Sequence, residues 1–307
     1  MDKIAIIVLN WKQPKLTIET VESILKTKQK NQTFHIYIID NGSRDNSFEQ
    51  FQKNFGKHKN VSILNTDSNL GYVGGNNFGI NAALKENFDW ILLINNDVLV
   101  DENFLDEMIN ACKKNTKIKI LGPKIYFAPG HEYHKDRYKK NELGKVIWSV
   151  GGNIDWNNII GSNIGIDEVD HGQYNQTQYN LDFISGCCML VKADLFKEIG
   201  LLDEKYFMYL EDADFCVRAR NSGHQNAYIP SSVIWPINAG SSSSGSELHN
   251  YFLTRNRLLF GYKYASTRTK FALFRESIKI LVLSKSIWQK KAIVDYYIKK
   301  LGKGSWQ

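Results

Sequence analysis

The sequence has 307 residues, of which 43% are hydrophobic and 12% aromatic, so the chain is long and apolar enough to bury a large core. Lys and Arg number 39 against 32 Asp and Glu, which gives a net charge of +7. No stretch approaches the roughly 18 to 20 apolar residues that cross a bilayer. The four cysteines form no CxxC pair, so they indicate neither a disulfide framework nor structural zinc, and they favour a cytoplasmic protein.

Residues 1–125 alternate apolar runs, typical of strands, with amphipathic segments, typical of helices. The first apolar run lacks the basic segment and cleavage site of a signal peptide, so it predicts a strand. Continuous apolar strands that alternate with helices predict a parallel sheet covered on both faces. The expected strands are residues 3–9, 34–39, 61–64 and 90–94. The expected helices are residues 14–25, a helix capped by Ser43 that carries Phe48, Phe51 and Phe55, a helix that ends at Leu84 after a Gly/Asn loop over 71–77, and residues 104–109.

The second half of the chain is less regular. Residues 126–180 are polar and aromatic, and glycines interrupt them. An apolar run over 183–190 predicts a strand, and a helix is expected over 193–199. A further helix is expected from Glu211 to about Ser222, followed by a Ser/Gly-rich segment over 230–245 that is either a mobile lid or an exposed connector.

Polar residues follow the ends of the expected strands. Asn10 ends the first strand, residues 40–43 follow the second, and residues 95–97 follow the fourth. A Gly/Asn segment over 69–77 lies between the last two groups in sequence. Any one group alone is more often a turn. Together they predict a binding site, because ligands of such sheets bind beyond the carboxyl ends of the strands.

The positive charge is concentrated near the C-terminus. Residues 263–303 contain eleven Lys or Arg against Glu276 and Asp295, a net charge of +9, which leaves about −2 for residues 1–262. Apolar residues recur at helical spacing between these cations. The pattern predicts a basic helical extension that binds an anionic membrane surface, packs as an ordinary helix, or forms a homodimer. No nucleic-acid partner is expected, since no RNP, zinc-finger or helix-turn-helix pattern is present.

The polar groups, in this order and spacing, resemble the family 2 glycosyltransferases, specifically their rhamnosyltransferase-like branch. The resemblance implies a GT-A fold, an α/β architecture with a Rossmann-like, mainly parallel sheet flanked by helices. It further implies a nucleotide-sugar-binding half over 1–125, an acceptor-binding and catalytic half over 126–245, and a helical basic tail over 246–307. The segments that carry it are Asn10-Trp11, DNGSRD at 40–45, NLGYVGGNN at 69–77, NND at 95–97, Gly151-Gly152, FMYLEDAD at 207–214 and RNR at 255–257.

The resemblance also implies roles for individual residues. Asp212 is expected to be the general base for the acceptor hydroxyl, or alternatively a helix cap, and Glu211 to position the acceptor. Asp97 is expected to hold the Mg²⁺ or Mn²⁺ that neutralises the leaving diphosphate. Arg255 and Arg257 are either a phosphate clamp or ion pairs on the tail helix. The expected donor-binding residues are Asn10, Asp40, Asn69, Gly71, Gly75, Asn77, Asn95, Asn96 and Arg257.

One departure concerns the metal. Related sequences usually carry a His just after the strand that follows the Glu-Asp helix, whereas residues 233–236 here are Val-Ile-Trp-Pro. The absence of this His therefore speaks against a strong dependence of the activity on a metal ion.

The expected function is inverting transfer of a sugar from a dTDP- or UDP-sugar in cell-surface polysaccharide synthesis, with rhamnose as the first candidate for the sugar. The acceptor is a glycan or a polyprenyl-diphosphate-linked glycan, and the location is cytoplasmic or peripheral at the inner face of the cell membrane. The rival is a catalytically silent nucleotide-sugar-binding or scaffold protein. A nucleotidyltransferase would carry an Arg/Lys-rich loop after the first strand, and a dehydrogenase would carry GxGxxG there.

Overall fold

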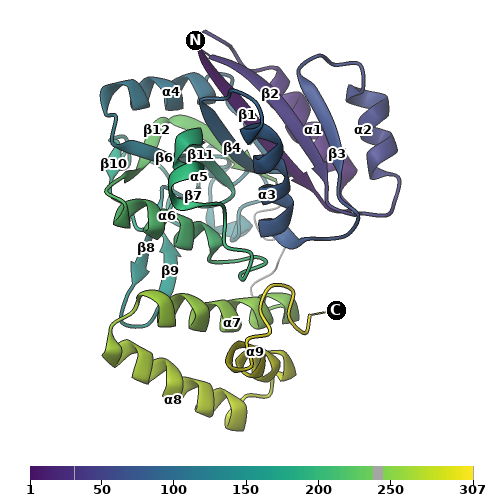
Figure 1. Ribbon diagram of the computed structural model, residues 1–307. Coiled ribbons are helices and arrows are strands. Elements are labelled where there is room, and N and C mark those ends of the chain that lie inside the picture. Colours follow the sequence, from purple (N-terminus) through teal and green to yellow (C-terminus); the bar gives the residue numbers. More distant parts are fainter. Residues whose placement is uncertain (31, 238–244, 307) are drawn as a thin grey trace.

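The computed structural model describes residues 1–30, 32–237 and 245–306 (Figure 1). A twisted sheet with helices on both faces forms the larger part, and the C-terminal helices lie together at one end of it. The expected α/β architecture with a helical C-terminal extension is confirmed.

The main sheet of the described residues has ten strands, eight of them in the order β10-β12-β6-β11-β4-β1-β2-β3, with β5 paired to β12 and β7 paired to β6. Its β3-β2-β1-β4 half is parallel, whereas β11 runs antiparallel between β4 and β6. The sheet therefore combines a parallel half with a mixed half. The strands are β1 (Asp2–Asn10), β2 (Gln32–Asp40), β3 (Val61–Asn65), β4 (Trp90–Asn95), β5 (Val98–Val100), β6 (Ile118–Tyr126), β7 (Ile147–Ser149), β10 (Gln178–Tyr179), β11 (Cys188–Lys192) and β12 (Gln225–Pro236), with a separate hairpin of β8 (Gly152–Asp155) and β9 (Ile160–Asn163).

Helices connect most of these strands and cover the sheet. The helix predicted to start at Pro14 does so, with the proline in its first turn, where a missing N–H costs no helical hydrogen bond. The helices are α1 (Pro14–Leu25), α2 (Ser47–Phe55), α3 (Gly71–Leu84), α4 (Phe104–Lys114), the 3₁₀ turn η1 (Lys135–Arg137), α5 (Ala193–Ile199), α6 (Glu211–Asn221), α7 (Glu247–Tyr264), α8 (Thr267–Leu283) and α9 (Ile287–Tyr297).

The core lies on both faces of the sheet. Along β1 the side chains alternate between the two sides, because successive residues of a strand point in opposite directions. Ala5 and Ile7 belong to one apolar cluster, and Ile4, Ile6 and Val8 belong to the other. This two-sided burial explains why the strand is a continuous apolar run, and it leaves the strand end as the first place where a polar residue is tolerated.

Four local predictions are wrong. Ser43 does not cap α2, which starts after Asn46. The Gly/Asn segment predicted as a loop over 71–77 forms the first turns of α3. The strand predicted over 183–190 begins only at Cys188. Of the segment predicted as a loop over 230–245, residues 230–236 belong to β12, and the lid or connector prediction for residues 238–244 falls outside the described residues.

The three C-terminal helices share one type of start. Ser246, Ser266 and Ser286 each precede a helix, and each hydroxyl oxygen accepts a hydrogen bond from the backbone N–H three residues later, at 3.2, 3.3 and 3.3 Å. Each serine thus satisfies an otherwise unpaired donor of the first helical turn. Within the described residues, none of the helices combines the length and apolar character that crossing a bilayer requires.

Candidate active site

The register of the parallel strands brings the predicted polar residues to one edge of the sheet. Asn10 at the end of β1 pairs with Asp40 at the end of β2, and Leu9 pairs with Asn95 at the end of β4. The prediction that these strand ends share one rim is confirmed.

A hydrogen-bond network occupies the centre of this rim. The buried Asn10 amide donates to Oδ1 of Asp40 at 3.0 Å, and its own oxygen accepts from Thr17 at 2.9 Å. The Ser43 hydroxyl also donates to Oδ1 of Asp40, and Asn96 donates to Thr17 at 3.0 Å. Asn10 is therefore committed to internal bonds, and its observed contribution is to fix the Asp40 carboxylate.

Asn41 organises the turn that leads into α3, a role that sequence reasoning did not assign to it. Its amide donates to the Gly71 carbonyl at 3.0 Å and to Asn69 at 3.2 Å, and its oxygen accepts from the backbone N–H of Leu70 at 3.0 Å. Asn69 accepts from the backbone N–H of Gly71 at 2.8 Å. Gly71 has φ +74°, and a Cβ there would lie 2.5 Å from the Phe207 ring.

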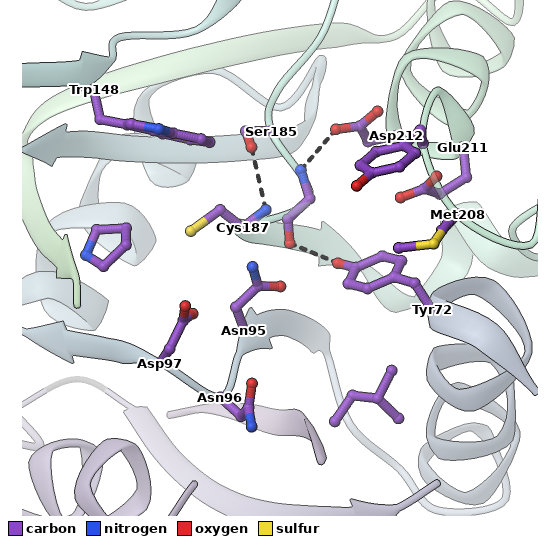
Figure 2. Close-up of a pocket in the computed structure, with 14 residues that line it drawn as sticks. Tyr72, Asn95, Asn96, Asp97, Trp148, Ser185, Cys187, Met208, Glu211 and Asp212 are labelled. Carbon is purple, nitrogen blue, oxygen red and sulfur yellow. Dashed lines mark hydrogen bonds between the residues drawn. The ribbon is translucent and has the colours of Figure 1, made fainter. Parts of the chain in front are cut away.

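A cavity of about 390 Å³ opens beside this rim (Figure 2). Asn95, Asn96 and Asp97 lie on one side of it, across from Glu211 and Asp212. It thus brings together the predicted metal ligand, two predicted donor residues and the predicted catalytic pair. Its lining also includes residues that were not predicted, namely Leu9, Tyr72, Trp148, Ser185, Gly186, Cys187, Met208, Tyr209 and Pro236.

The Asp212 carboxylate is fixed by two backbone amides. Oδ2 accepts from the N–H of Gly186 at 2.9 Å, and Oδ1 accepts from the N–H of Ala213, in the first turn of α6, at 2.8 Å. The Tyr72 hydroxyl donates to the carbonyl of Gly186 at 2.6 Å, so α3 and Asp212 hold the same residue (Figure 2). Sequence reasoning missed this contact, although the Ser185-Gly186 interruption of the apolar run could have signalled it.

Burial raises the pKa of Asp212, and its backbone hydrogen bonds oppose that effect. The pKa of Glu211 is raised well above its ordinary value, first by burial and then by the neighbouring Asp212 charge. Glu211 is 6% exposed, and its Oε2 has no hydrogen-bond partner within the described chain. A buried carboxyl oxygen without a partner is costly. This arrangement suits a protonated Glu211 that donates to a bound molecule beside an Asp212 that accepts.

The segment 207–210, which we call the catalytic loop, has an unusual backbone. Phe207, Tyr209 and Leu210 have φ of 66°, 67° and 68°, a left-handed conformation that each non-glycine residue adopts only at a cost of about 1–2 kcal/mol. The loop contacts α3, since the Phe207 carbonyl accepts from the N–H of Val73 at 3.0 Å. It leads directly into α6 and therefore determines where Glu211 and Asp212 begin.

Two buried residues of α7 hold this loop. The Asn256 amide donates to the carbonyls of Tyr206, Met208 and Tyr209 at 2.9, 2.7 and 2.9 Å. The Arg255 guanidinium donates to the carbonyls of Tyr206 and Gly302 at 2.9 and 2.6 Å, and the side chain is fully buried. Arg255 thus binds backbone oxygens, which differs from both the phosphate clamp and the ion pair that were expected.

Three other predicted donor residues also lie away from the cavity lining. Asn77 is buried and exchanges hydrogen bonds with the backbone of Leu202, at 2.9 and 3.1 Å. Arg257 forms an ion pair with Glu276 at 2.6 Å and donates to the carbonyl of Asn158. Gly75 packs against β1, where a Cβ would lie 2.4 Å from Leu9. These contacts explain the three residues structurally, and their donor-binding role stays a prediction.

The oxygen ligands on the Asp97 side suit a hard divalent cation. Asp97 is a nearly buried carboxylate on the cavity wall, and the amides of Asn95 and Asn96 lie beside it. The described residues contain no group of three or more His, Cys, Asp or Glu side chains that could hold a metal. Pro236, in the segment where a His was sought, lies at the cavity edge. The donor set therefore fits a cation shared with a phosphate, as Mg²⁺ often is, better than an all-protein cage.

Solved structures with the same fold include two glycosyltransferases. GalNAc-T7, solved with UDP, GalNAc and Mn²⁺, superposes with a TM-score of 0.70 at 13% identity over 97% of this chain and 57% of that one. The mannosyltransferase PcManGT of Pyrobaculum calidifontis, solved with GDP-Man and Mn²⁺, gives a TM-score of 0.56 at 10% identity over 96% and 74%. At this identity the likeness establishes the GT-A fold alone.

Sequence relatives point to the same class of enzyme. The low-salt glycan biosynthesis hexosyltransferase Agl10 of Haloferax volcanii is 25% identical over 76% of this chain and 68% of its own length. The N-acetylglucosaminyl-diphospho-decaprenol L-rhamnosyltransferase of Mycobacterium tuberculosis is 27% identical over 70% of each. The sequence model of glycosyl transferase family 2 matches residues 4–200. The chain therefore belongs to glycosyl transferase family 2.

Proposed function

We propose that the protein transfers a sugar from a dTDP- or UDP-sugar to a glycan or polyprenyl-diphosphate-linked acceptor in cell-surface polysaccharide synthesis. Rhamnose is the first candidate for the sugar. The observation that carries the proposal is the placement of Asp97 and Asp212 on opposite sides of one cavity. One side suits a leaving diphosphate, and the other presents a fixed carboxylate to an acceptor. The mycobacterial relative, whose name specifies a lipid-linked acceptor and rhamnose, supports the choice of sugar and acceptor.

In the proposed reaction the acceptor hydroxyl attacks the anomeric carbon while its proton passes to Asp212. The bond from that carbon to the nucleoside diphosphate breaks on the opposite side, so one displacement inverts the configuration. Asp212 suits this role because its two hydrogen bonds fix its position and burial raises its pKa, which makes the carboxylate a stronger base. Glu211 would donate from its buried carboxyl to another acceptor hydroxyl and thereby orient it.

On the donor side, Asp40 would accept hydrogen bonds from the base or ribose. Asn95 and Asn96 would contact the ribose or diphosphate. Asp97 would hold a Mg²⁺ or Mn²⁺ ion, which when bound supplies positive charge for the leaving diphosphate. The Mn²⁺ in both structural neighbours supports this assignment, and metal dependence of the activity is part of the proposal.

The first test is nucleotide binding followed by thermal unfolding. UDP, dTDP, GDP, CDP and ADP are added singly, with and without Mn²⁺. A ligand at 100 times its Kd stabilises the folded protein by about 2.7 kcal/mol, which a melting curve detects. Stabilisation by dTDP or UDP supports the proposal and identifies the base of the donor.

The control variant is Asp40→Asn, which keeps an oxygen that can accept from Asn10 and Ser43 while it removes the charge. This variant is expected to retain the fold and to lose most of the nucleotide-induced shift. If no nucleotide stabilises the wild-type protein, the donor site is absent and the silent scaffold protein becomes the better account.

A further inference from the structure

The second candidate site of the molecule is the outer face of α8. Thr269, Leu273 and Ser277 are the buried residues of this helix. Leu273 packs against α7, where a Cβ on Gly261 would lie 2.3 Å from it. In Figure 1, α8 forms the outermost layer of the C-terminal helices, with α7 between it and the sheet. The side of α8 opposite to this buried stripe therefore faces away from the described protein.

That outer side is apolar and exposed. Phe271 is 67% exposed and Val282 is 69% exposed, values that are high for side chains of this size. At 3.6 residues per turn the exposed apolar residues of α8 fall within an arc of about 100°, whose centre lies about 130° around the helix from that of the buried stripe. These residues are Phe271, Phe274, Ile278, Leu281 and Val282, which together we call the α8 face.

Cations border this arc on both sides. Lys270 lies at one edge, and Arg268, Arg275 and Lys279 lie at the other, as helical geometry requires of their positions. None of these four side chains forms an ion pair with a carboxylate in the described part of the chain. Their charges are therefore available to an external anionic partner, and they lie where they would surround an apolar contact.

The neighbouring helix extends the same surface. The Phe274 ring meets the Tyr297 ring of α9 edge to face, with centroids 6.5 Å apart. Leu283 and Ile287, on either side of the turn between the helices, are 68% and 61% exposed. The apolar area thus continues from α8 across this turn toward α9.

We propose that the α8 face docks on an anionic phospholipid bilayer. Its apolar side chains would enter the boundary between headgroups and acyl chains, and the bordering cations would contact lipid phosphates, as interfacial amphipathic helices do. A second copy of this chain fits less well, because the two faces would bring their cations together. The connection to the candidate site is α7, where Gly261 packs against Leu273 of α8 and Asn256 donates to the Met208 carbonyl at 2.7 Å.

The test is co-sedimentation of the full chain with vesicles of phosphatidylcholine alone or of an equal mixture with phosphatidylglycerol. We expect binding to the mixed vesicles to exceed binding to the neutral ones by about tenfold or more, and to weaken at high salt. The double variant Phe271→Glu/Ile278→Glu should lose about tenfold or more. Its matched control is Ile166→Glu/Tyr179→Glu, which adds the same charge at exposed residues outside the three helices and should bind like the wild type.

Equal binding to both kinds of vesicle, or no binding, would overturn the proposal. The proposal would also be overturned if light scattering showed a dimeric wild type and a monomeric α8-face variant, and neither protein bound vesicles. All of the substituted side chains are exposed, so the variants should melt like the wild type. The readout does not involve sugar transfer: a protein that sediments with anionic vesicles but binds no nucleotide would keep this proposal and refute the proposed function.

Discussion

Removal of the Asn256 side chain should both destabilise the protein and displace Glu211 and Asp212, the proposed catalytic pair. The amide donates to the carbonyls of Tyr206, Met208 and Tyr209 and is fully buried. Because it has two hydrogens, we count two net hydrogen bonds of about 1 kcal/mol each, and roughly 1 kcal/mol more for carbonyls left unpaired. Asn256→Ala should therefore cost about 3 kcal/mol, which at about 2 °C per kcal/mol for a chain of this length lowers Tm by about 6 °C.

The catalytic consequence follows from the backbone of the catalytic loop. Without Asn256, the left-handed residues Phe207, Tyr209 and Leu210 should relax, and a shift of about 1 Å at Glu211 and Asp212 would lower kcat by about 10²-fold. Turnover is measured well below the melting range of the variant, where it is folded.

The control for this prediction is Asn250→Ala, on the same helix, whose amide makes a single surface hydrogen bond to Gly245 at 3.0 Å. The control should differ little from the wild type in either measurement. An Asn256→Ala protein with lowered Tm but wild-type kcat would show that the loop is held for stability alone, and unchanged values of both would refute the reasoning.

Three further substitutions test single contacts. Tyr72→Phe removes the hydroxyl that donates to the Gly186 carbonyl. Gly186 should then be held less firmly, and its N–H, which favours the charged form of Asp212, should bind that carboxylate more weakly, so the pKa of Asp212 should rise. If the charged form of Asp212 loses about 1 kcal/mol of stabilisation, the acid limb of the pH–rate profile moves up by about 0.7 pH unit. An unmoved limb would show that Tyr72 does not influence Asp212 through Gly186. Asp97→Asn should abolish the additional thermal stabilisation that a nucleotide gives when Mn²⁺ is present. If that additional stabilisation persisted, the ion would be bound elsewhere. Gly71→Ala should lower the free energy of unfolding by about 1–2 kcal/mol, because an alanine would be strained at the positive φ of this position. A variant that unfolds in denaturant with wild-type stability would contradict this reasoning.

The strand ends could be predicted from the sequence because burial on both faces leaves a clear signature. The central strands β1 and β4 are continuous apolar runs over 4–9 and 90–94, and β2 is largely apolar over 34–39. The polar residue that ends each run marks the edge of the sheet, as at Asn10, Asp40 and Asn95. The parallel arrangement then places these residues together, because the carboxyl ends of parallel strands lie at the same edge of the sheet. For this reason the rim of the candidate site emerged without a structure.

The start of α3 could not be predicted because tertiary packing overrides local preference there. Glycine and asparagine disfavour helices, so residues 71–77 resemble a loop. Yet a Cβ on Gly75 or Gly79 would lie 2.4 Å from Leu9 or 2.7 Å from Ile7, so these glycines let the helix approach the sheet closely. The preference against helix is overcome by a contact that local sequence does not reveal.

The contacts that hold Glu211 and Asp212 on the opposite wall of the cavity escaped prediction for a related reason. Gly186 acts through its backbone, and Tyr72 contributes a hydroxyl from the first turn of a helix that was predicted as a loop. Arg255 and Asn256 lie far along the chain from the loop that they hold, and their partners are backbone carbonyls. Side-chain identity alone does not identify such long-range contacts to the main chain.

The most direct test of the central claim is the rate of nucleoside diphosphate release in the presence of acceptor, measured for the wild type and Asp212→Asn. The donor is the dTDP- or UDP-sugar whose nucleotide stabilises the protein, and the acceptor is a polyprenyl-diphosphate-linked glycan. Loss of a general base predicts a fall in kcat of about 10²- to 10⁴-fold with nucleotide stabilisation unchanged. If Asp212→Asn released the diphosphate at the wild-type rate, the assignment of the two cavity walls would be wrong.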